Sequence, residues 1–163
     1  MKDGNAVSVP GVMVLLAILS TPLPTRVQAG EVEDTALAFV QERQLGDGLG
    51  WLGYQVASRT ETFGQLVERL GKTQAQALVQ GELKRVQPQY QGQWERNLAR
   101  AYAHSFNADE LRQLNQGQGS LALKNRFKVR NNEVGQEMKN SSAQLLSEFV
   151  AQALNNALKT PVP

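Results

Sequence analysis

The stretch YQGQWERNLARAYAHSF, residues 90–106, decides the fold class. A large apolar side chain stands at every fourth position of it, as Tyr90, Trp94, Leu98, Tyr102 and Phe106. Side chains four residues apart lie on one face of an α-helix and drift slowly around its axis. The spacing therefore predicts a helix whose apolar stripe is the central buried face of the protein.

The rest of the chain shows the same spacing of three and four residues, and almost none of the alternation typical of strands. We expect an all-α protein, a compact bundle of about six or seven helices. Pro88 is expected to end one helix and begin the next, because a first-turn proline loses no hydrogen bond. The first expected helices are about Glu31–Gln44 and Leu49–Ala57, followed by one that Thr60 or Thr62 caps and that ends at Gly71, and one that Thr73 caps and that ends near Val86. The later ones are Pro88–Phe106, a helix that begins with an Asn107/Glu110 capping box, and about Glu133–Leu158.

Residues 120–130 are ambiguous, because apolar and basic residues alternate there with the period of a strand. No partner strand is predicted elsewhere, and a lone strand would leave its backbone groups unpaired. We therefore expect a helix, with a strand as the alternative. On a helix, the basic residues of this segment form two pairs on distinct faces, Lys124 with Lys128 and Arg126 with Arg130. This cluster is a candidate interaction patch for anionic lipid, lipopolysaccharide phosphates or an acidic protein, although a solvated face is the simpler interpretation.

Residues 1–29 resemble a secretory signal peptide. Lys2 precedes an apolar run from Val12 to Leu19, and Val27-Gln28-Ala29 places small residues at a cleavage site. The alternative is an uncleaved anchor, but the apolar run is shorter than the about 20 residues that a membrane-spanning helix needs. We therefore expect export to the periplasm, no transmembrane segment after cleavage, and one helical domain over 30–163 with a disordered C-terminal tail.

The composition limits the classes of partner. The chain has no cysteine, so its stability must come from packing rather than from disulfides. Removing residues 1–29 takes two of the 17 basic and one of the 15 acidic residues, which leaves a net charge of about +1. A nearly neutral protein has little tendency to bind nucleic acid, so the expected partner is an envelope protein or an anionic envelope component, and a homo-oligomer is possible.

The sequence offers no catalytic constellation. His104 is the only histidine and cysteine is absent, so neither a zinc site nor a cofactor site is expected. Candidate serines lie outside any nucleophile-elbow pattern, and the adjacent Asp109 and Glu110 suit helix capping better than a glycosidase pair. Gly117-Gln118-Gly119 lacks the lysine and preceding strand of a phosphate-binding loop.

Residues 98–111, LARAYAHSFNADEL, resemble the signature of an exported bacterial family, domain-of-unknown-function family 2059. The family pattern is a tyrosine followed by Phe-[Ser/Thr]-x-x-Glu-Leu at the start of a helix. Tyr102, Phe106, Glu110 and Leu111 match it, and Asn107 replaces the usual hydroxyl cap. The aromatic pair and proline that usually follow in the family are missing here. The resemblance, over residues 70–155, implies a helical periplasmic protein and assigns no activity.

Three functional hypotheses follow in order of preference. The first is a non-enzymatic protein that acts through interactions with proteins or envelope components. The second is a binding module that holds an apolar or amphipathic small ligand between helices, in a groove near Tyr90, Trp94 and Tyr102. The third is an envelope hydrolase that uses two carboxylates, which requires acidic groups converging in a cleft.

Overall fold

The computed structural model describes residues 25–161, so most of the predicted signal peptide lies outside the described residues. Within them the chain forms seven helices and no strand, which confirms the all-α prediction. Residues 120–130 belong to a helix, as expected. The helices are α1 (Thr25–Glu42), α2 (Leu49–Ala57), α3 (Glu61–Leu70), α4 (Lys72–Ser105), α5 (Ala108–Asn115), α6 (Leu121–Ser141) and α7 (Ala143–Lys159).

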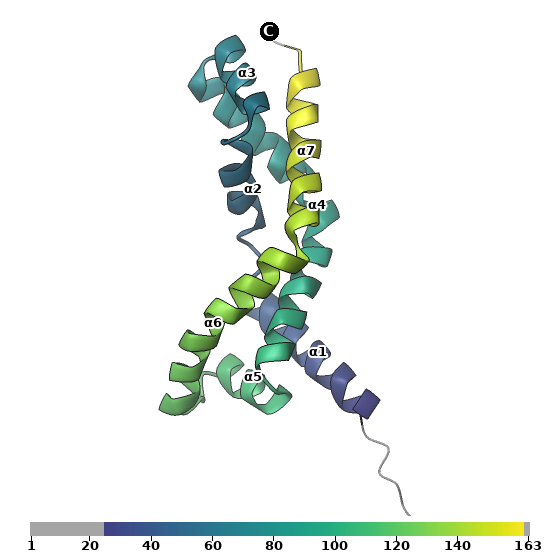
Figure 1. Cartoon of the computed structure of the whole chain (residues 1–163), viewed down its shortest axis with the longest axis vertical. Coiled ribbons are helices and arrows are strands. Elements are labelled where there is room, and N and C mark those ends of the chain that lie inside the picture. The colour runs from purple at the N-terminus through teal and green to yellow at the C-terminus, as the bar shows by residue number, and fades with distance from the viewer. Residues whose placement is uncertain (1–24, 162–163) are drawn as a thin grey trace, which may run out of the picture.

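Helix α4 is the spine of an elongated molecule (Figure 1). Its N-terminal half packs with α2, α3 and α7 in the upper part of the view. Its C-terminal half packs with α1 and α6 in the lower part, where α5 lies against α1. None of the described helices combines the length and apolarity needed to cross a membrane.

The core consists of two clusters, one on each half of α4. The upper cluster includes Leu49, Leu83 and Phe149, and the lower cluster includes Phe39, Tyr102 and Leu111. Trp94 packs partly buried against both clusters. The apolar stripe is therefore buried mainly at its C-terminal end, where Tyr102 and Phe106 are buried, while Tyr90, Trp94 and Leu98 remain half-buried.

Three predicted helix boundaries are wrong. Pro88 does not end a helix, because α4 runs through it and keeps its exposed proline ring on the solvent side. The predicted helix over Glu133–Leu158 is two helices, because the chain turns at Ser142, between α6 and α7. Thr73 also does not cap α4, which begins at Lys72 after Gly71.

Side-chain caps lie at the starts of α3 and α5. The Thr60 hydroxyl accepts a hydrogen bond from the Phe63 amide at 3.2 Å, which satisfies a free amide in the first turn of α3. Gly71, which ends α3, has φ +78°, in the region that only glycine adopts without strain. The capping box of α5 is present as predicted: the Glu110 amide donates to Asn107 Oδ1 and the Asn107 amide donates to the Glu110 carboxylate.

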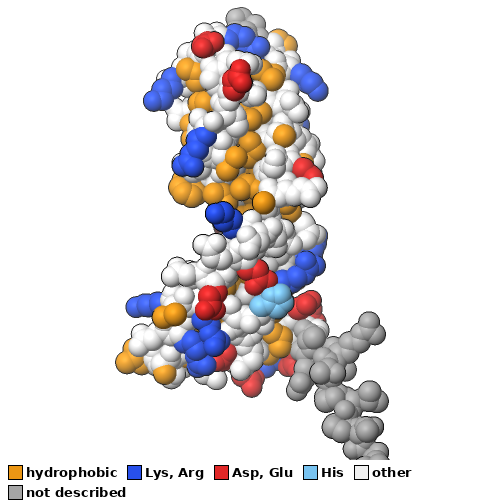
Figure 2. All heavy atoms as spheres, viewed as in Figure 1, with side chains coloured by type: hydrophobic (Ala, Val, Ile, Leu, Met, Phe, Trp, Pro, Cys, Tyr) orange, Lys and Arg blue, Asp and Glu red, His pale blue; other side chains and the backbone are white. Residues whose placement is uncertain are grey.

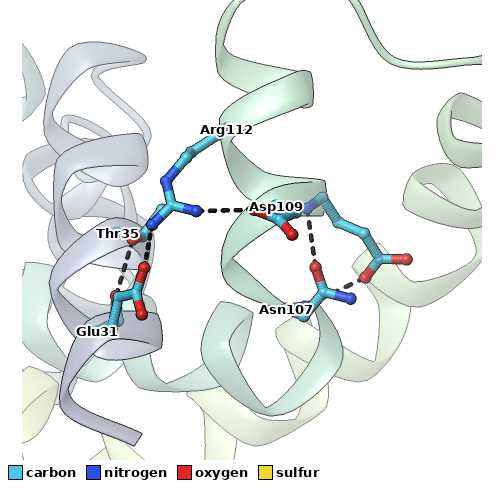
Figure 3. Close-up of polar contacts among 6 residues, drawn as sticks. Glu31, Thr35, Asn107, Asp109 and Arg112 are labelled. Carbon is cyan, nitrogen blue, oxygen red and sulfur yellow. Dashed lines mark hydrogen bonds and ion pairs between the residues drawn. The ribbon is translucent and has the colours of Figure 1, made fainter. Parts of the chain in front are cut away.

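Polar contacts hold α5 against α1 beside this cap (Figure 3). Arg112 pairs with Glu31 of α1 and, at 2.8 Å, with Asp109 one turn earlier in α5. The carboxylate of Glu31 raises the pKa of Arg112 above its ordinary value. These side chains are largely exposed, so they define the orientation of α5 more than they stabilise the fold.

Candidate functional site

An apolar groove lies between α2 and α7, and α4 and α6 complete it. Its volume is about 910 Å³. Figure 2 shows a band of hydrophobic side chains along the upper half of the molecule, where α2 and α7 run side by side in Figure 1. The groove continues down to the junction of α6 and α7.

The lining is set by the helical repeat of α7. Leu146, Val150 and Leu154 recur every four residues and form one wall. Leu52 and Val56 of α2 line the opposite side, one turn apart. Three of the four exposed α7 residues in the lining are small, Ala143, Ser147 and Ala151, so they leave the groove open to solvent.

One charged side chain lines the groove. Lys139 stands in the last turn of α6, close to the chain turn at Ser142, and none of the ion pairs formed by the described residues includes it. No aspartate or glutamate is among the lining residues. The remaining polar groups are neutral, with Thr60 and Asn155 on the α2 and α7 sides and Asn131 on α6.

The structure brings two of the three predicted groove residues into the lining. Trp94 and Tyr102 both line the groove, although Tyr102 is only 5% exposed. Its hydroxyl donates to Asn131 Oδ1 at 3.0 Å, its ring stacks on Phe127, and burial raises its pKa. Tyr90 does not line the groove: its hydroxyl donates to Gln152 at 2.5 Å and its ring packs against Phe149.

The predicted basic cluster divides into the two pairs that a helix requires. Arg126 pairs with Glu110 at 2.8 Å. Arg130 donates to the Ser105 carbonyl and lies over the Phe106 ring, so both arginines tie α6 to the segment around α5. Lys124 and Lys128 lie on another face and are exposed.

His104 takes part in a surface contact rather than in a cluster of ligands. Its Nδ1 lies 2.6 Å from Glu137 Oε1, beside a hollow of about 440 Å³ that Arg126 and Arg130 also line. Glu110 is the only carboxylate in the lining of that hollow. Among residues 25–161 no three or more His, Asp or Glu side chains are placed to hold a metal ion.

Sequence reasoning missed most of the groove. Leu146 and Val150 belong to the apolar stripe predicted for the last helix, but nothing in their spacing indicates that part of the stripe has no covering helix. Nothing in the sequence around Lys139 indicated that it would line a groove. The exposed small residues Ala143, Ser147 and Ala151, each one turn from the next, are the one pattern that pointed to an uncovered face.

No family model matches this chain, and neither the curated proteins nor the solved structures contain a match to it.

Proposed function

We propose that this protein is a non-enzymatic, periplasmic binding protein that holds an amphipathic molecule with one apolar chain and an anionic headgroup. The groove between α2 and α7 is the site, and the apolar chain lies along it. The observation that carries the proposal is an open groove with apolar walls and a single charged residue, Lys139.

The size and chemistry of the groove support an apolar chain as the occupant. Its volume of about 910 Å³ falls within the range of small-molecule sites, about 300–1,000 Å³. The lining of α7 extends from Ala143 to Asn155, a length of about 18 Å at the helical rise. Covering the partly exposed Leu52, Val56 and Leu146 with an alkyl chain would remove apolar surface from water, which is worth about 25 cal/mol per Å².

The charge of the lining supports an anionic headgroup. Lys139 has no carboxylate beside it in the lining, so its field at the rim is uncompensated there. An anion beside it gains a charge-assisted hydrogen bond, whereas a cationic headgroup would be repelled. Ser147 adds an exposed hydroxyl group to the lining.

The groove suits binding better than hydrolysis. A glycosidase needs two carboxyl groups facing each other across the substrate, and the groove lining contains none. The other two hollows described have one carboxylate each, Glu110 in one and Asp47 in the other. The hollows described therefore give no support to the two-carboxylate hydrolase.

The position of Trp94 gives a direct test. The chain has two tryptophans, and Trp51 is 68% exposed and outside the groove lining, so Trp51→Phe leaves Trp94 as the only tryptophan. We expect brominated palmitate to quench the fluorescence of Trp94 in a saturable way. Unbrominated palmitate should compete, and dodecyltrimethylammonium, which has a cationic headgroup, should not.

Two variants locate the binding site. Ser147→Phe puts an aromatic ring into the groove from an exposed position without adding a tryptophan and should abolish quenching, whereas Lys139→Gln should weaken binding several-fold. Lys84→Gln, which removes an exposed lysine of α4 outside the groove lining, is the matched control. Equal quenching in Ser147→Phe and in the parent, or none in either, contradicts the proposal.

A further inference from the structure

At the end of the molecule formed by the last part of α5, the following turn and the first half of α6, the chain carries basic residues and no acidic ones. Residues 111–132 contain five basic residues and no aspartate or glutamate. Arg112 and Arg126 are paired with carboxylates of other segments, Asp109 and Glu31 for the first and Glu110 for the second. The charges of Lys124 and Lys128 are not neutralised in this way.

The inner face of this part of α6 is fixed to the body of the protein. Leu123 is buried in the lower core cluster, and Phe127, one turn later, packs partly buried against the same cluster. Arg130 on the next turn bonds to the Ser105 carbonyl. The direction in which the opposite face points is therefore set by the fold.

That opposite face combines the two most exposed large apolar side chains of α6 with two of its lysines, Lys124 and Lys128, which none of the ion pairs of the described residues includes. Leu121 is 75% exposed and Val129 is 68% exposed. Lys124 and Lys128 follow Leu121 by three and seven residues, so they lie on the same side of the helix. Figure 2 shows hydrophobic and basic side chains together at the lower left, where α6 begins in Figure 1. We call Leu121, Lys124, Lys128 and Val129 the lysine face.

We propose that the lysine face docks on the surface of an anionic membrane. Leu121 and Val129 enter the boundary between headgroups and acyl chains, while Lys124 and Lys128 extend their ammonium groups to lipid phosphates. Lysine side chains are suited to this arrangement because their alkyl stems accept apolar surroundings while the charge stays in the polar layer.

The geometry favours a membrane over an acidic protein partner. A protein partner recognises pockets that accept anchoring side chains. None of the lysine face lines any of the three hollows described, and Leu121 and Val129 stand separately, two turns apart. A lipid surface needs no pocket and accepts isolated apolar side chains with flanking cations.

Labelled single-cysteine variants test the docking in the full chain. Because the protein has no cysteine, Leu121→Cys and Lys72→Cys each provide one site for an environment-sensitive fluorophore, at the lysine face and at the start of α4 respectively. With phosphatidylglycerol-containing vesicles we expect a blue shift at position 121 that salt reverses, and no shift at position 72. Pure phosphatidylcholine vesicles should shift neither probe.

Charge-reversal variants provide a second test of membrane docking. Lys124→Glu/Lys128→Glu should lower the apparent affinity reported by the probe at position 121 by about tenfold or more. Each lysine near an anionic surface contributes a factor of about five to the affinity, and both contributions are lost. Lys72→Glu/Lys84→Glu changes the net charge equally at the other end of the molecule and should leave the affinity unchanged. Both variants keep the same N-terminal segment, so any membrane binding by that segment is common to them. A probe at position 121 that stays in water on anionic vesicles, or equal loss in both double variants, overturns the proposal, and the palmitate test of the groove is unaffected by either result.

Discussion

The side-chain amide of Asn97 in α4 donates a hydrogen bond to the hydroxyl oxygen of Ser142 at 2.9 Å, and both residues are buried. Ser142 is the residue between α6 and α7, and Asn97 also accepts a hydrogen bond from Gln93 at 2.8 Å. This contact connects the turn between α6 and α7 to the middle of α4. It therefore fixes the point at which the groove passes from the α6 wall to the α7 wall.

Replacing Asn97 with alanine tests this contact. The change leaves the buried Ser142 hydroxyl with only the weak acceptor Met138 Sδ at 3.8 Å. We expect the free energy of unfolding to fall by about 1–3 kcal/mol, the cost of losing a buried polar partner. Urea unfolding followed by circular dichroism measures it.

Asn125→Ala is the control for that measurement, because Asn125 is an exposed residue of the neighbouring α6. Its effect should stay within about 0.5 kcal/mol. Equal stability of the two variants would mean that the Asn97–Ser142 contact does not hold the turn.

The turn at Ser142 also explains why part of the fold was not predictable. Apolar residues continue through Val134, Met138, Leu145 and Phe149 without a proline or glycine at the break, so local spacing favours one helix. The residue at the break is hydrogen-bonded by Asn97, which is distant in sequence, and local patterns carry no information on such a partner. The capping box of α5, by contrast, is local and was predictable from Asn107 and Glu110 alone.

The same reasoning applies to the groove. The stripe of α4 placed Trp94 and Tyr102 correctly on an apolar face, since that face is a property of one helix. Whether a neighbour covers the face is a property of the whole arrangement. Tyr90 is covered by Phe149 and Gln152, whereas Trp94, one turn later, is left at the groove.

Gly53 of α2 marks the closest approach of α2 to α7. A Cβ atom at this position would overlap Cε1 of Phe149 and lie 3.0 Å from its Cδ1 and 3.1 Å from Leu83 Cδ2. Both neighbours are buried, so neither ring nor methyl group can move freely. We expect Gly53→Ala to destabilise the protein by about 1–3 kcal/mol through overpacking, as measured by urea unfolding.

Gly81→Ala is the matched control for Gly53→Ala. Gly81 is also inside a helix, is exposed, and has no atom within 4 Å of the added Cβ. Alanine should stabilise the protein there by about 1 kcal/mol, because it is the better helix former. A destabilising Gly81→Ala, or a neutral Gly53→Ala, would contradict the packing described for α2 and α7.

Pro88 lies inside α4, which continues as a helix on both sides of the proline. A proline has no N–H group, so the carbonyl of Lys84 one turn earlier loses its helical partner. We expect Pro88→Ala to restore this hydrogen bond and to raise the free energy of unfolding by about 1–3 kcal/mol.

Thermal unfolding followed by circular dichroism at 222 nm, where helices give a strong signal, would measure this change in stability. Lys84→Ala is the control, because it alters an exposed residue of α4 one turn away without changing the backbone bonds. A lower stability of Pro88→Ala would contradict this prediction and would mean that the packing around residue 88 requires the proline.

The hydroxyl of Tyr102 makes the stability of the protein depend on alkaline pH. Burial raises the pKa of Tyr102 above its ordinary value, so the folded state holds this proton more tightly than the unfolded state does. The contribution is fully present below the pKa of the unfolded state, about 10, and is lost as the pH rises towards the folded pKa. Tyr102→Phe removes this titration.

At neutral pH, Tyr102→Phe should also lower the free energy of unfolding by about 0.5–1.5 kcal/mol, because the hydrogen bond to Asn131 is lost. We therefore expect the stability difference between the parent and Tyr102→Phe to shrink above pH 10, as measured by urea unfolding at a series of pH values, while other titrating groups contribute equally to both proteins. A difference that stays constant across this range would show that the phenol is as well solvated in the folded protein as in the unfolded chain.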